Sequence, residues 1–343
     1  MKQHLNTLFV TTPRSFLRKD GEAVAVRLDG ETRLRVPLHH LGSIVTFGAI
    51  GVSPALMGAC GKAGIAISFL NDHGGFLARV CGPTAGNVLL RREQYRRADD
   101  EPASLAIARM VVLAKVANAR TVLMRAARDH PEALGRDELQ RAVDRLGATL
   151  RDVEKAETLD SLRGLEGDAA KSYFAVFNAM ITAQKESFVL DGRSRRPPLD
   201  PVNALLSFLY AILTHDTRSA CETTGLDPAV GFLHRDRPGR PGLALDLVEE
   251  LRSFLADRLA LSLINRRQIT AAGFVRQETG AYEMDADTRK AVLVAYQKRK
   301  QETITHPFLR ETTTIGLVPH LQARLLARYL RGDLDAYPPF IAK

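Results

Sequence analysis

The chain of 343 residues has no tryptophan, only three cysteines, and aromatic residues at 6% of its positions. Cys60, Cys81 and Cys221 are scattered and form no C-x-x-C pair, so the sequence offers neither a disulfide framework nor a zinc knuckle. We interpret them as small apolar residues of the interior. The scarcity of aromatic residues also argues against a stacking platform for single-stranded nucleic acid.

Long apolar segments are absent as well. The longest stretch free of charge and histidine, Leu41 to Gly61, is interrupted by glycines and by Pro54, which argues against a membrane-spanning helix. The first twenty residues contain no continuous apolar core of a secretory signal. Neither a glycine-rich Rossmann motif nor a Walker loop is found. We therefore expect a cytoplasmic protein that has no membrane partner and no dinucleotide or P-loop site.

Positive charge is what the sequence has in excess. Lysine and arginine number 48 against 39 aspartates and glutamates, which leaves a net charge of +9. Such a surface attracts polyanions, nucleic acid first and anionic membrane second. The charge indicates a class of partner and no activity.

The residues up to position 83 predict a β-rich domain. Asp20-Gly21 and Asp29-Gly30 are tight-turn dipeptides, and Ser53 with Pro54 predicts the start of one short helix over residues 53–61. Alternation of polar and apolar residues over 32–36 is typical of a half-buried antiparallel strand. The expected strands cover residues 23–28, 32–36, 43–47, 65–70 and 76–80, the last two joined as a hairpin through residues 71–75.

After Gly82-Pro83 the composition changes to long segments with apolar residues three and four positions apart, which predict helices. We expect them at residues 87–98, 102–128, 136–155, 156–185, 201–224, 246–264, 286–303 and 315–331. The order of strands first and helices later predicts an α+β protein, with a small β-rich domain at 1–83 and a larger all-α domain at 84–343. It argues against a doubly wound sheet.

Glu166 is the first candidate for chemistry. Gly164 and Gly167 flank it within a segment that otherwise favours helix, and each glycine costs roughly 1 kcal/mol relative to alanine there. The glycines therefore indicate a kink or a close backbone approach. The alternative is an ordinary exposed glutamate near a helix junction.

His234 is the second candidate. It follows the apolar pair Phe232-Leu233 and precedes a basic loop rich in proline and glycine, a kind of segment that often carries functional groups. A lone histidine is more often a structural hydrogen-bonding residue. Its surroundings favour the functional interpretation.

The segment from Leu243 to Arg252 holds the third candidate group. Asp246 and Glu249 are three positions apart and Asp246 and Glu250 four, so each pair projects from a common side of the predicted helix, and Asp246 lies beside its apolar stripe. An unpaired carboxylate is unfavourable there, and a divalent cation would compensate its charge. The alternative is an acidic first turn that complements the helix dipole.

Together, one histidine and two or three carboxylates form a mixed nitrogen and oxygen site suited to Mn²⁺ or Mg²⁺. In a basic protein such a site indicates phosphodiester chemistry. Nearby arginines are candidates for DNA binding, namely Arg235, Arg237, Arg240 and Arg252.

These segments resemble the signature of a known family, the CRISPR-associated adaptation integrase, CRISPR-associated protein one. The resemblance rests on residues 225–228, 231–234 and 243–252, and upstream on Glu166-Gly167 with Ala170, Tyr173 and Phe174. Residues 203–210 resemble the helix between the two motifs, and residues 64–69 resemble a strand of the family more weakly. The resemblance therefore spans most of the chain in the expected order.

The resemblance implies a β-rich dimerisation domain and a helical catalytic domain. It places the family's metal ligands on Glu166, His234 and Glu249, with Asp246 as a nearby functional acid. Some relatives have aspartate at the position of Glu249, so Asp246 is retained as second choice for the ligand or as its partner. The implied catalytic set is Glu166, His234, Asp246 and Glu249.

The implied activity is CRISPR spacer acquisition. A homodimer, acting with the family's small partner, CRISPR-associated protein two, would join the 3′-hydroxyl ends of short double-stranded DNA fragments to CRISPR repeat DNA by transesterification. With water as the nucleophile, the same site would act as a DNA endonuclease. The residues also leave open a stand-alone metal-dependent DNA-repair nuclease and a non-catalytic architectural DNA-binding protein.

Overall fold

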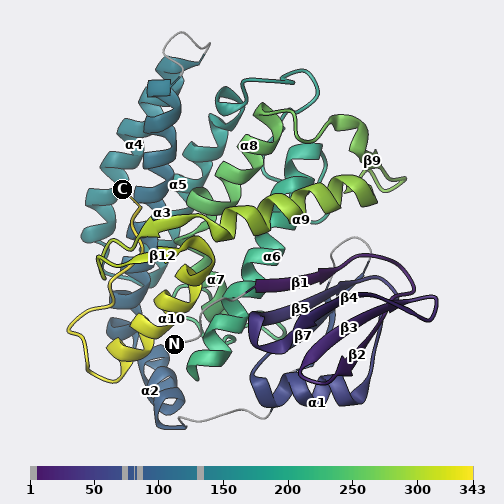
Figure 1. Cartoon of the computed structure of the whole chain (residues 1–343). Coiled ribbons are helices and arrows are strands. Elements are labelled where there is room, and N and C mark those ends of the chain that lie inside the picture. The colour runs from purple at the N-terminus through teal and green to yellow at the C-terminus, as the bar shows by residue number, and fades with distance from the viewer. Residues whose placement is uncertain (1–5, 72–75, 81, 83–87, 130–134, 343) are drawn as a thin grey trace. The chain divides into compact units, whose positions relative to one another are not determined.

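The computed structural model describes residues 6–71, 76–80, 82, 88–129 and 135–342. The chain divides into two compact units (Figure 1). The first comprises residues 1–86 with 296–302 and 314–317, and the second comprises 87–295, 303–313 and 318–343. The expected domain boundary at Pro83 lies outside the described residues. Two short segments that we expected in the C-terminal domain thus belong to the first unit.

Two four-stranded sheets form the first unit. One has the order β1 (Asn6–Val10), β5 (Leu41–Phe47), β7 (Ala66–Leu70), β8 (Phe76–Val80), with β1, β5 and β7 parallel and β8 antiparallel. The other has the order β4 (Glu31–Pro37), β3 (Ala23–Leu28), β2 (Phe16–Asp20), β6 (Gly51–Val52). Their apolar side chains share a core that includes Leu17, Val24, Ile44 and Ile67, together with Leu56 of the helix at residues 54–63.

Most sequence predictions for this unit are confirmed. Helix α1 (Pro54–Ala63) begins with Pro54, and the Ser53 hydroxyl accepts a hydrogen bond from the Leu56 N–H at 3.3 Å. Strands β7 and β8 pair antiparallel, as the predicted hairpin requires, although its turn at 72–75 lies outside the described residues. Cys60 and Cys221 are buried and free, whereas Cys81 is not described.

The prediction of a half-buried strand at residues 32–36 is wrong for most of its length. Strand β4 pairs antiparallel with β3 as expected, but it lies at the edge of its sheet, and Leu34 is 46% exposed. Only Val36 packs against the core. Alternation in the sequence identified the strand, but its burial depends on what covers the sheet.

The second unit is mostly helical, which confirms the α+β fold class (Figure 1). Its helices are α2 (Val88–Asp99), α3 (Glu101–Asp129), α4 (Arg136–Glu154), α5 (Leu159–Ala175), α6 (Pro201–Thr224), α7 (Gly242–Glu249), α8 (Arg258–Asn265), the first part of α9 (Ala286–Gln301) and α10 (Val318–Leu330). The expectation of an all-α domain needs one correction. Three-residue strands form two small sheets, β9 (Phe274–Arg276) with β10 (Tyr282–Met284) and β11 (Thr303–Thr305) with β12 (Thr312–Thr314). Such strands are too short to show a period of two.

Two helix predictions differ from the structure in their bounds. The helix expected at 156–185 ends at Ala175, because the chain turns back and the Asn178 side chain pairs with both the N–H and the carbonyl of Leu190. The helix expected at 246–264 begins earlier, at Gly242, and is interrupted after Glu249. A π-helical segment, Arg252–Asp257, follows and leads into α8. Such irregular turns occur frequently at functional sites.

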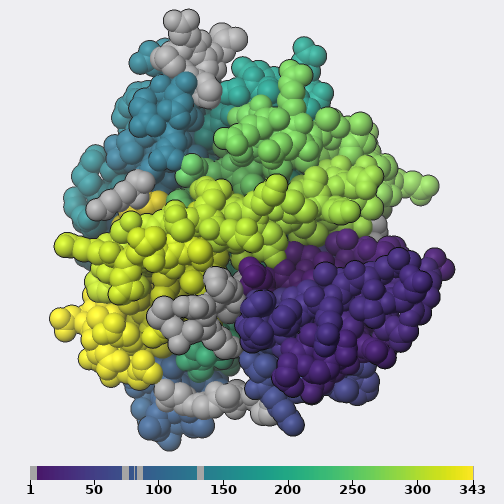
Figure 2. All heavy atoms as spheres, in the orientation of Figure 1, coloured from purple at the N-terminus to yellow at the C-terminus, as the bar shows by residue number. Residues whose placement is uncertain are grey.

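Helix α3 is the central helix of this unit. It is long and apolar enough to span a membrane, but 56% of its most apolar window is buried inside the protein, as in a core helix. It packs against α4, α5, α7 and the π-helical segment. At the lower edge of the view, α10 lies beside α2 (Figure 1 and Figure 2), where the Arg97 guanidinium stacks 5.8 Å from the Tyr329 ring.

Candidate active site

The loop between α6 and α7 carries His234 and is fixed on both sides. Gln94 of α2 donates from its side-chain amide to the carbonyls of Asp227 and Val230, each at 2.8 Å, and accepts from the Asp227 N–H at 2.9 Å. On the other side, the Leu243 N–H at the start of α7 donates to the Pro228 carbonyl at 3.0 Å. The loop main chain before His234 is therefore held by the Gln94 side chain on one side and by the start of α7 on the other.

Gly231 allows this loop to lie directly on α7. A Cβ at this position would meet Asp246 Oδ2 and the Gly242 carbonyl carbon, each at 2.7 Å. Real Cβ atoms do not approach other atoms so closely, so only glycine fits here without displacement. The lack of space for a side chain thus explains why a glycine precedes Phe232 in the sequence motif.

Asp246 holds His234 in place. Its Oδ1 accepts from the His234 main-chain N–H at 3.0 Å and lies 2.6 Å from the His234 Nδ1. Its Oδ2 accepts from the N–H groups of Phe232 at 2.6 Å and Leu233 at 3.1 Å. With Asp246 as the acceptor of these bonds, the imidazole Nδ1 is the donor, and Nε2 is the ring nitrogen that faces Glu249. This pattern is typical of a metal-binding histidine oriented by a carboxylate.

Glu249 and Glu166 meet at Lys115 of α3. The Lys115 ammonium forms ion pairs with Glu166 Oε1 and, at 2.7 Å, with Glu249 Oε2. The His234 Nε2 lies 3.8 Å from the other Glu249 oxygen. The structure thus joins Glu166 and Glu249 at the Lys115 ammonium and places the His234 ring beside Glu249, although the three residues come from α5, a loop and α7.

Arg252 completes the environment of Glu249. Its guanidinium lies 2.5 Å from Glu249 Oε1 and stacks 5.0 Å from the Tyr210 ring. Burial opposes ionisation of Glu249, but the positive charges of Arg252 and Lys115 outweigh it and lower the pKa of this carboxyl to about 2. Glu249 is therefore an ionised carboxylate in the interior, poised to bind a cation.

The four arginines proposed for DNA binding fall into two groups. Arg235 and Arg237 are exposed and Arg240 is half-buried in the loop after His234, as a DNA contact requires. Arg235 and Arg163 both bind Asp160, and Arg163 also donates to the Leu233 carbonyl, which ties α5 to the His234 loop. Arg252 differs, because only 14% of its side chain is exposed and its charge faces Glu249. Its position indicates a role in holding Glu249.

Two interpretations made from the sequence are wrong. Helix α5 runs without interruption through Gly164 and Gly167, and a Cβ on either glycine would meet no atom within 4 Å, so neither marks a kink or a close approach. The first turn of α7 contains no acidic residue, because the helix begins at Gly242. Asp246 therefore does not serve the helix dipole.

Lys115 is the residue of the site that the sequence analysis missed. It is the one charged residue in the stretch Met110–Ala119 of α3, and that isolation is the signal that would have found it. A lysine that is mostly buried requires a charged partner. Here it has two.

The donor set fits a hard divalent cation. Among the residues that the structure describes, no three His, Cys, Asp or Glu side chains form a ready ligand cluster, and the Lys115 ammonium lies between the carboxylates of Glu166 and Glu249. That ammonium shows that the space between them accepts a positive charge. Two carboxylates and an imidazole with a free Nε2 are ligands suited to Mn²⁺ or Mg²⁺.

Comparison with known families identifies the chain. The model of the family described as CRISPR associated protein Cas1 matches residues 8–298. The chain belongs to the Cas1 family. It is 57% identical over 350 residues to CRISPR-associated endonuclease Cas1 2 of Rhodospirillum rubrum, and each chain is covered completely. It is 54% identical over 341 residues to CRISPR-associated endonuclease Cas1 1 of Chlorobaculum tepidum, with 99% of each chain covered. The family resemblance seen in the sequence is thereby confirmed.

Solved structures show that the fold is that of the family. A CAS1 protein from Thermotoga maritima superposes with a TM-score of 0.82 at 21% identity, covering 98% of this chain and 100% of that one. A casposase bound to its integration product gives 0.83 at 22% identity, with 97% and 93% covered. A chain of a Cas6-RT-Cas1–Cas2 complex gives 0.82 at 24% identity, with 98% of this chain and 36% of that one covered.

Proposed function

We propose that this chain is a metal-dependent DNA integrase and endonuclease of CRISPR spacer acquisition. The observation that carries the proposal is that Glu166 and Glu249 share one cationic partner, with His234 beside Glu249, in a basic protein of the Cas1 family. The names of its close relatives, CRISPR-associated endonucleases, support the nuclease activity, and the casposase fold supports integration.

Glu166, Glu249 and the His234 Nε2 would hold the metal, Mg²⁺ or Mn²⁺. When bound, the metal would act as a Lewis acid toward the phosphodiester and lower the pKa of the attacking hydroxyl. Asp246 orients the His234 ring through its Nδ1, and Arg252 fixes Glu249. Lys115 holds the two carboxylates together and would have to release them as the metal binds.

The reaction would be a transesterification. The 3′-hydroxyl of a DNA fragment attacks a phosphodiester at the repeat boundary, and a new phosphorus–oxygen bond forms as the bond to the 3′ oxygen of the repeat strand breaks. One phosphodiester replaces another, so no ATP is consumed. With water as the nucleophile, the same exchange cuts the strand.

The partners in this proposal are double-stranded DNA fragments, CRISPR repeat DNA, a second copy of this chain and CRISPR-associated protein two, all in the cytoplasm. The net charge of +9 supports the DNA partners. A similar chain is part of a complex that contains Cas2, which supports the protein partner. The first unit, with its two sheets, would mediate dimerisation.

An integration assay with His234→Ala tests the proposal. The assay combines the chain, CRISPR-associated protein two, a labelled duplex, repeat DNA and Mn²⁺. We expect a loss of product of about a hundredfold or more, with duplex binding unchanged, because the variant loses a metal ligand. The matched control is His39→Ala, since His39 is exposed and belongs to the first unit.

Undiminished product from His234→Ala would contradict the assignment. Cleavage of branched DNA without the partner or a repeat, and no integration with them, would instead indicate a stand-alone repair nuclease. An architectural DNA-binding protein would show no cleavage, and Mn²⁺ would not raise its thermal midpoint.

A further inference from the structure

Lys115 places a positive charge where two carboxylates of the candidate active site meet. Its side chain is 14% exposed and comes from α3, where it is the one charged residue in the stretch Met110–Ala119. The ammonium forms ion pairs with Glu166 and, at 2.7 Å, with Glu249. Lys115 is thus the cation that the two carboxylates share.

Each carboxylate oxygen of Glu249 faces a different cation. Arg252 lies 2.5 Å from Oε1, and the Lys115 ammonium lies 2.7 Å from Oε2. The same ammonium also pairs with Oε1 of Glu166. A metal that binds the two facing oxygens of Glu166 and Glu249 together would therefore take the place of the Lys115 ammonium.

Lys115 is the more easily displaced of the two cations. The Arg252 guanidinium is planar and stacks 5.0 Å from the Tyr210 ring, so packing as well as charge fixes its orientation. The Lys115 ammonium is a point charge at the end of a flexible four-carbon chain. An ammonium and a divalent ion on the same oxygens repel each other. The lysine side chain therefore has to turn away as a metal binds.

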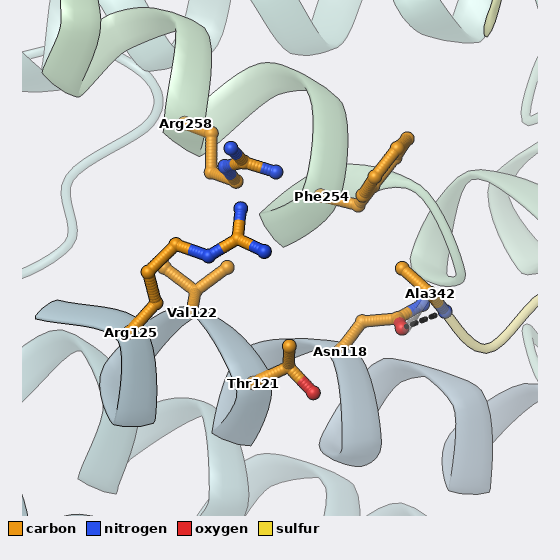
Figure 3. A pocket seen from close by; sticks show the side chains of 7 residues that line it. All are labelled: Asn118, Thr121, Val122, Arg125, Phe254, Arg258 and Ala342. Atoms are coloured by element: carbon orange, nitrogen blue, oxygen red, sulfur yellow. Dashed lines mark hydrogen bonds between the residues drawn. The ribbon is translucent and has the colours of Figure 1, made fainter. Parts of the chain in front are cut away.

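The main chain that carries Lys115 is fixed. Three residues further along α3, the buried Asn118 amide donates to the carbonyls of Glu250 at 2.7 Å and Phe340 at 2.8 Å. Its oxygen accepts from the Ala342 N–H at 2.8 Å, the bond drawn in Figure 3. These bonds tie α3 to the end of α7 and to the C-terminal segment. The side chain of Lys115, and not its helix, is therefore the part that moves.

The fold leaves a small space for the displaced ammonium. A cavity of about 30 Å³ has Lys115, Glu249, Arg252 and Ser253 in its lining. One water needs about 10–15 Å³ of such space, and an ammonium group is of similar size. The buried Ser253 hydroxyl has no hydrogen-bond partner among the residues that the structure describes, so it offers an acceptor.

We propose that Lys115 is an internal competitor of the metal. Its ammonium takes the metal's place between Glu166 and Glu249 in the metal-free protein, and the metal displaces it on binding. The inference rests on the proposed function and adds a control on its metal site. Lys115 keeps the two carboxylates together before the metal arrives and so sets the metal concentration at which the site is loaded.

The test is the affinity of the metal-free full chain for Mn²⁺, measured by titration calorimetry without DNA. The variant is Lys115→Met, which keeps an unbranched side chain and removes the charge. We expect its Mn²⁺ dissociation constant to fall about tenfold, because the metal no longer displaces a cation. The matched control is Lys171→Met, which should leave the dissociation constant unchanged, because Lys171 is exposed on α5, the helix that carries Glu166.

Thermal unfolding gives a second readout. Without metal, Lys115→Met leaves the buried Glu249 with one cation fewer, so its thermal midpoint should lie below that of the unmodified protein. The same Mn²⁺ concentration should then raise the midpoint of the variant more, because tighter binding to the folded state stabilises it more. If Lys115→Met does not fold without metal, Lys115→Gln replaces it, since its amide can still donate to one carboxylate.

Lys115→Arg separates charge from structural damage. It keeps the positive charge, so Mn²⁺ should bind it no more tightly than the unmodified protein. Tighter binding to Lys115→Arg, or unchanged affinity in Lys115→Met and Lys115→Gln, would contradict the competition. If Arg252→Gln tightens Mn²⁺ binding and the Lys115 variants do not, Arg252 is the displaced cation and the inference is wrong. If neither the unmodified protein nor any Lys115 variant binds Mn²⁺, the proposed function fails as well.

Discussion

Glu249 and Glu250 are neighbours in sequence, equally buried, and opposite in their surroundings. Glu249 faces the cations Lys115 and Arg252, and its pKa is lowered to about 2. Glu250 accepts hydrogen bonds from the Tyr337 hydroxyl at 2.6 Å, the Phe340 N–H at 2.7 Å and the Gln322 amide at 2.8 Å. Burial raises the pKa of Glu250 to about 7 in spite of these bonds.

The difference shows that two adjacent residues at the end of α7 lie in different environments, one charged and one neutral. On the Glu249 side, charged groups hold a carboxylate ionised for a cation. On the Glu250 side, the carboxyl group accepts hydrogen bonds from neutral donors of α10 and the C-terminal segment. These bonds attach the C-terminal segment to the end of α7. Adjacent side chains on a helix point about 100° apart, so one position lies in each environment.

The largest expected effect separates the two glutamates by activity. Glu249→Gln removes the negative charge from the proposed metal site, and we expect Mn²⁺-dependent cleavage to fall about a thousandfold or more. Glu250→Gln is the matched control and should retain activity within about threefold, because its amide can still pair with Tyr337 and Gln322. Kinetics of DNA cleavage measure both. Equal losses would mean that Glu250 also contributes to the chemistry.

The next effect concerns the pH dependence of stability. The pKa of Glu250 is 4.5 in the unfolded chain and about 7 in the fold, so between these values the folded protein binds more protons. The free energy of unfolding from this group therefore decreases as the pH rises through that window, by about 2 kcal/mol from pH 5 to 8. Burial of Asp257 raises its pKa to about 6 and adds a decrease of the same sign between pH 3.8 and about 6.

Urea denaturation at several pH values checks this dependence. Glu250→Gln should flatten most of the decrease between pH 6 and 7, because the pKa of Glu250, about 7, makes its contribution there larger than that of Asp257, whose pKa is about 6. A slope as steep as that of the unmodified protein in this interval would show that Glu250 is ionised in the fold.

The smallest effect tests geometry on the Glu249 side. Gly231→Ala adds a methyl group 2.7 Å from Asp246 Oδ2, which displaces the carboxylate that orients His234. We expect about a tenfold loss of cleavage, within the usual range for groups that orient a metal ligand. Gly164→Ala is the control, since its Cβ meets open space, and should raise stability by about 1 kcal/mol. Retained activity in Gly231→Ala would show that the loop has room to relax.

Local signals in the sequence predicted much of the fold. The cap at Ser53, the turn dipeptides and the helical periodicity of 201–224 match the structure, because each depends on neighbouring residues. The predictions failed where distant residues decide. Asn178 ends α5 through a bond to Leu190, and the edge position of β4 leaves Leu34 exposed.

By itself the sequence determined the class of the fold and the positive charge, because these depend on composition and periodicity, and its motifs showed the family resemblance that implies Glu166, His234, Asp246 and Glu249 as candidate residues. Only the tertiary structure decided that Asp246 supports His234, that Arg252 faces inward, and that Lys115 joins Glu166 to Glu249. The physical reason is that electrostatic interactions depend on distance and burial in space. Lys115 and Glu166 are 51 positions apart in the chain and in direct contact in the fold.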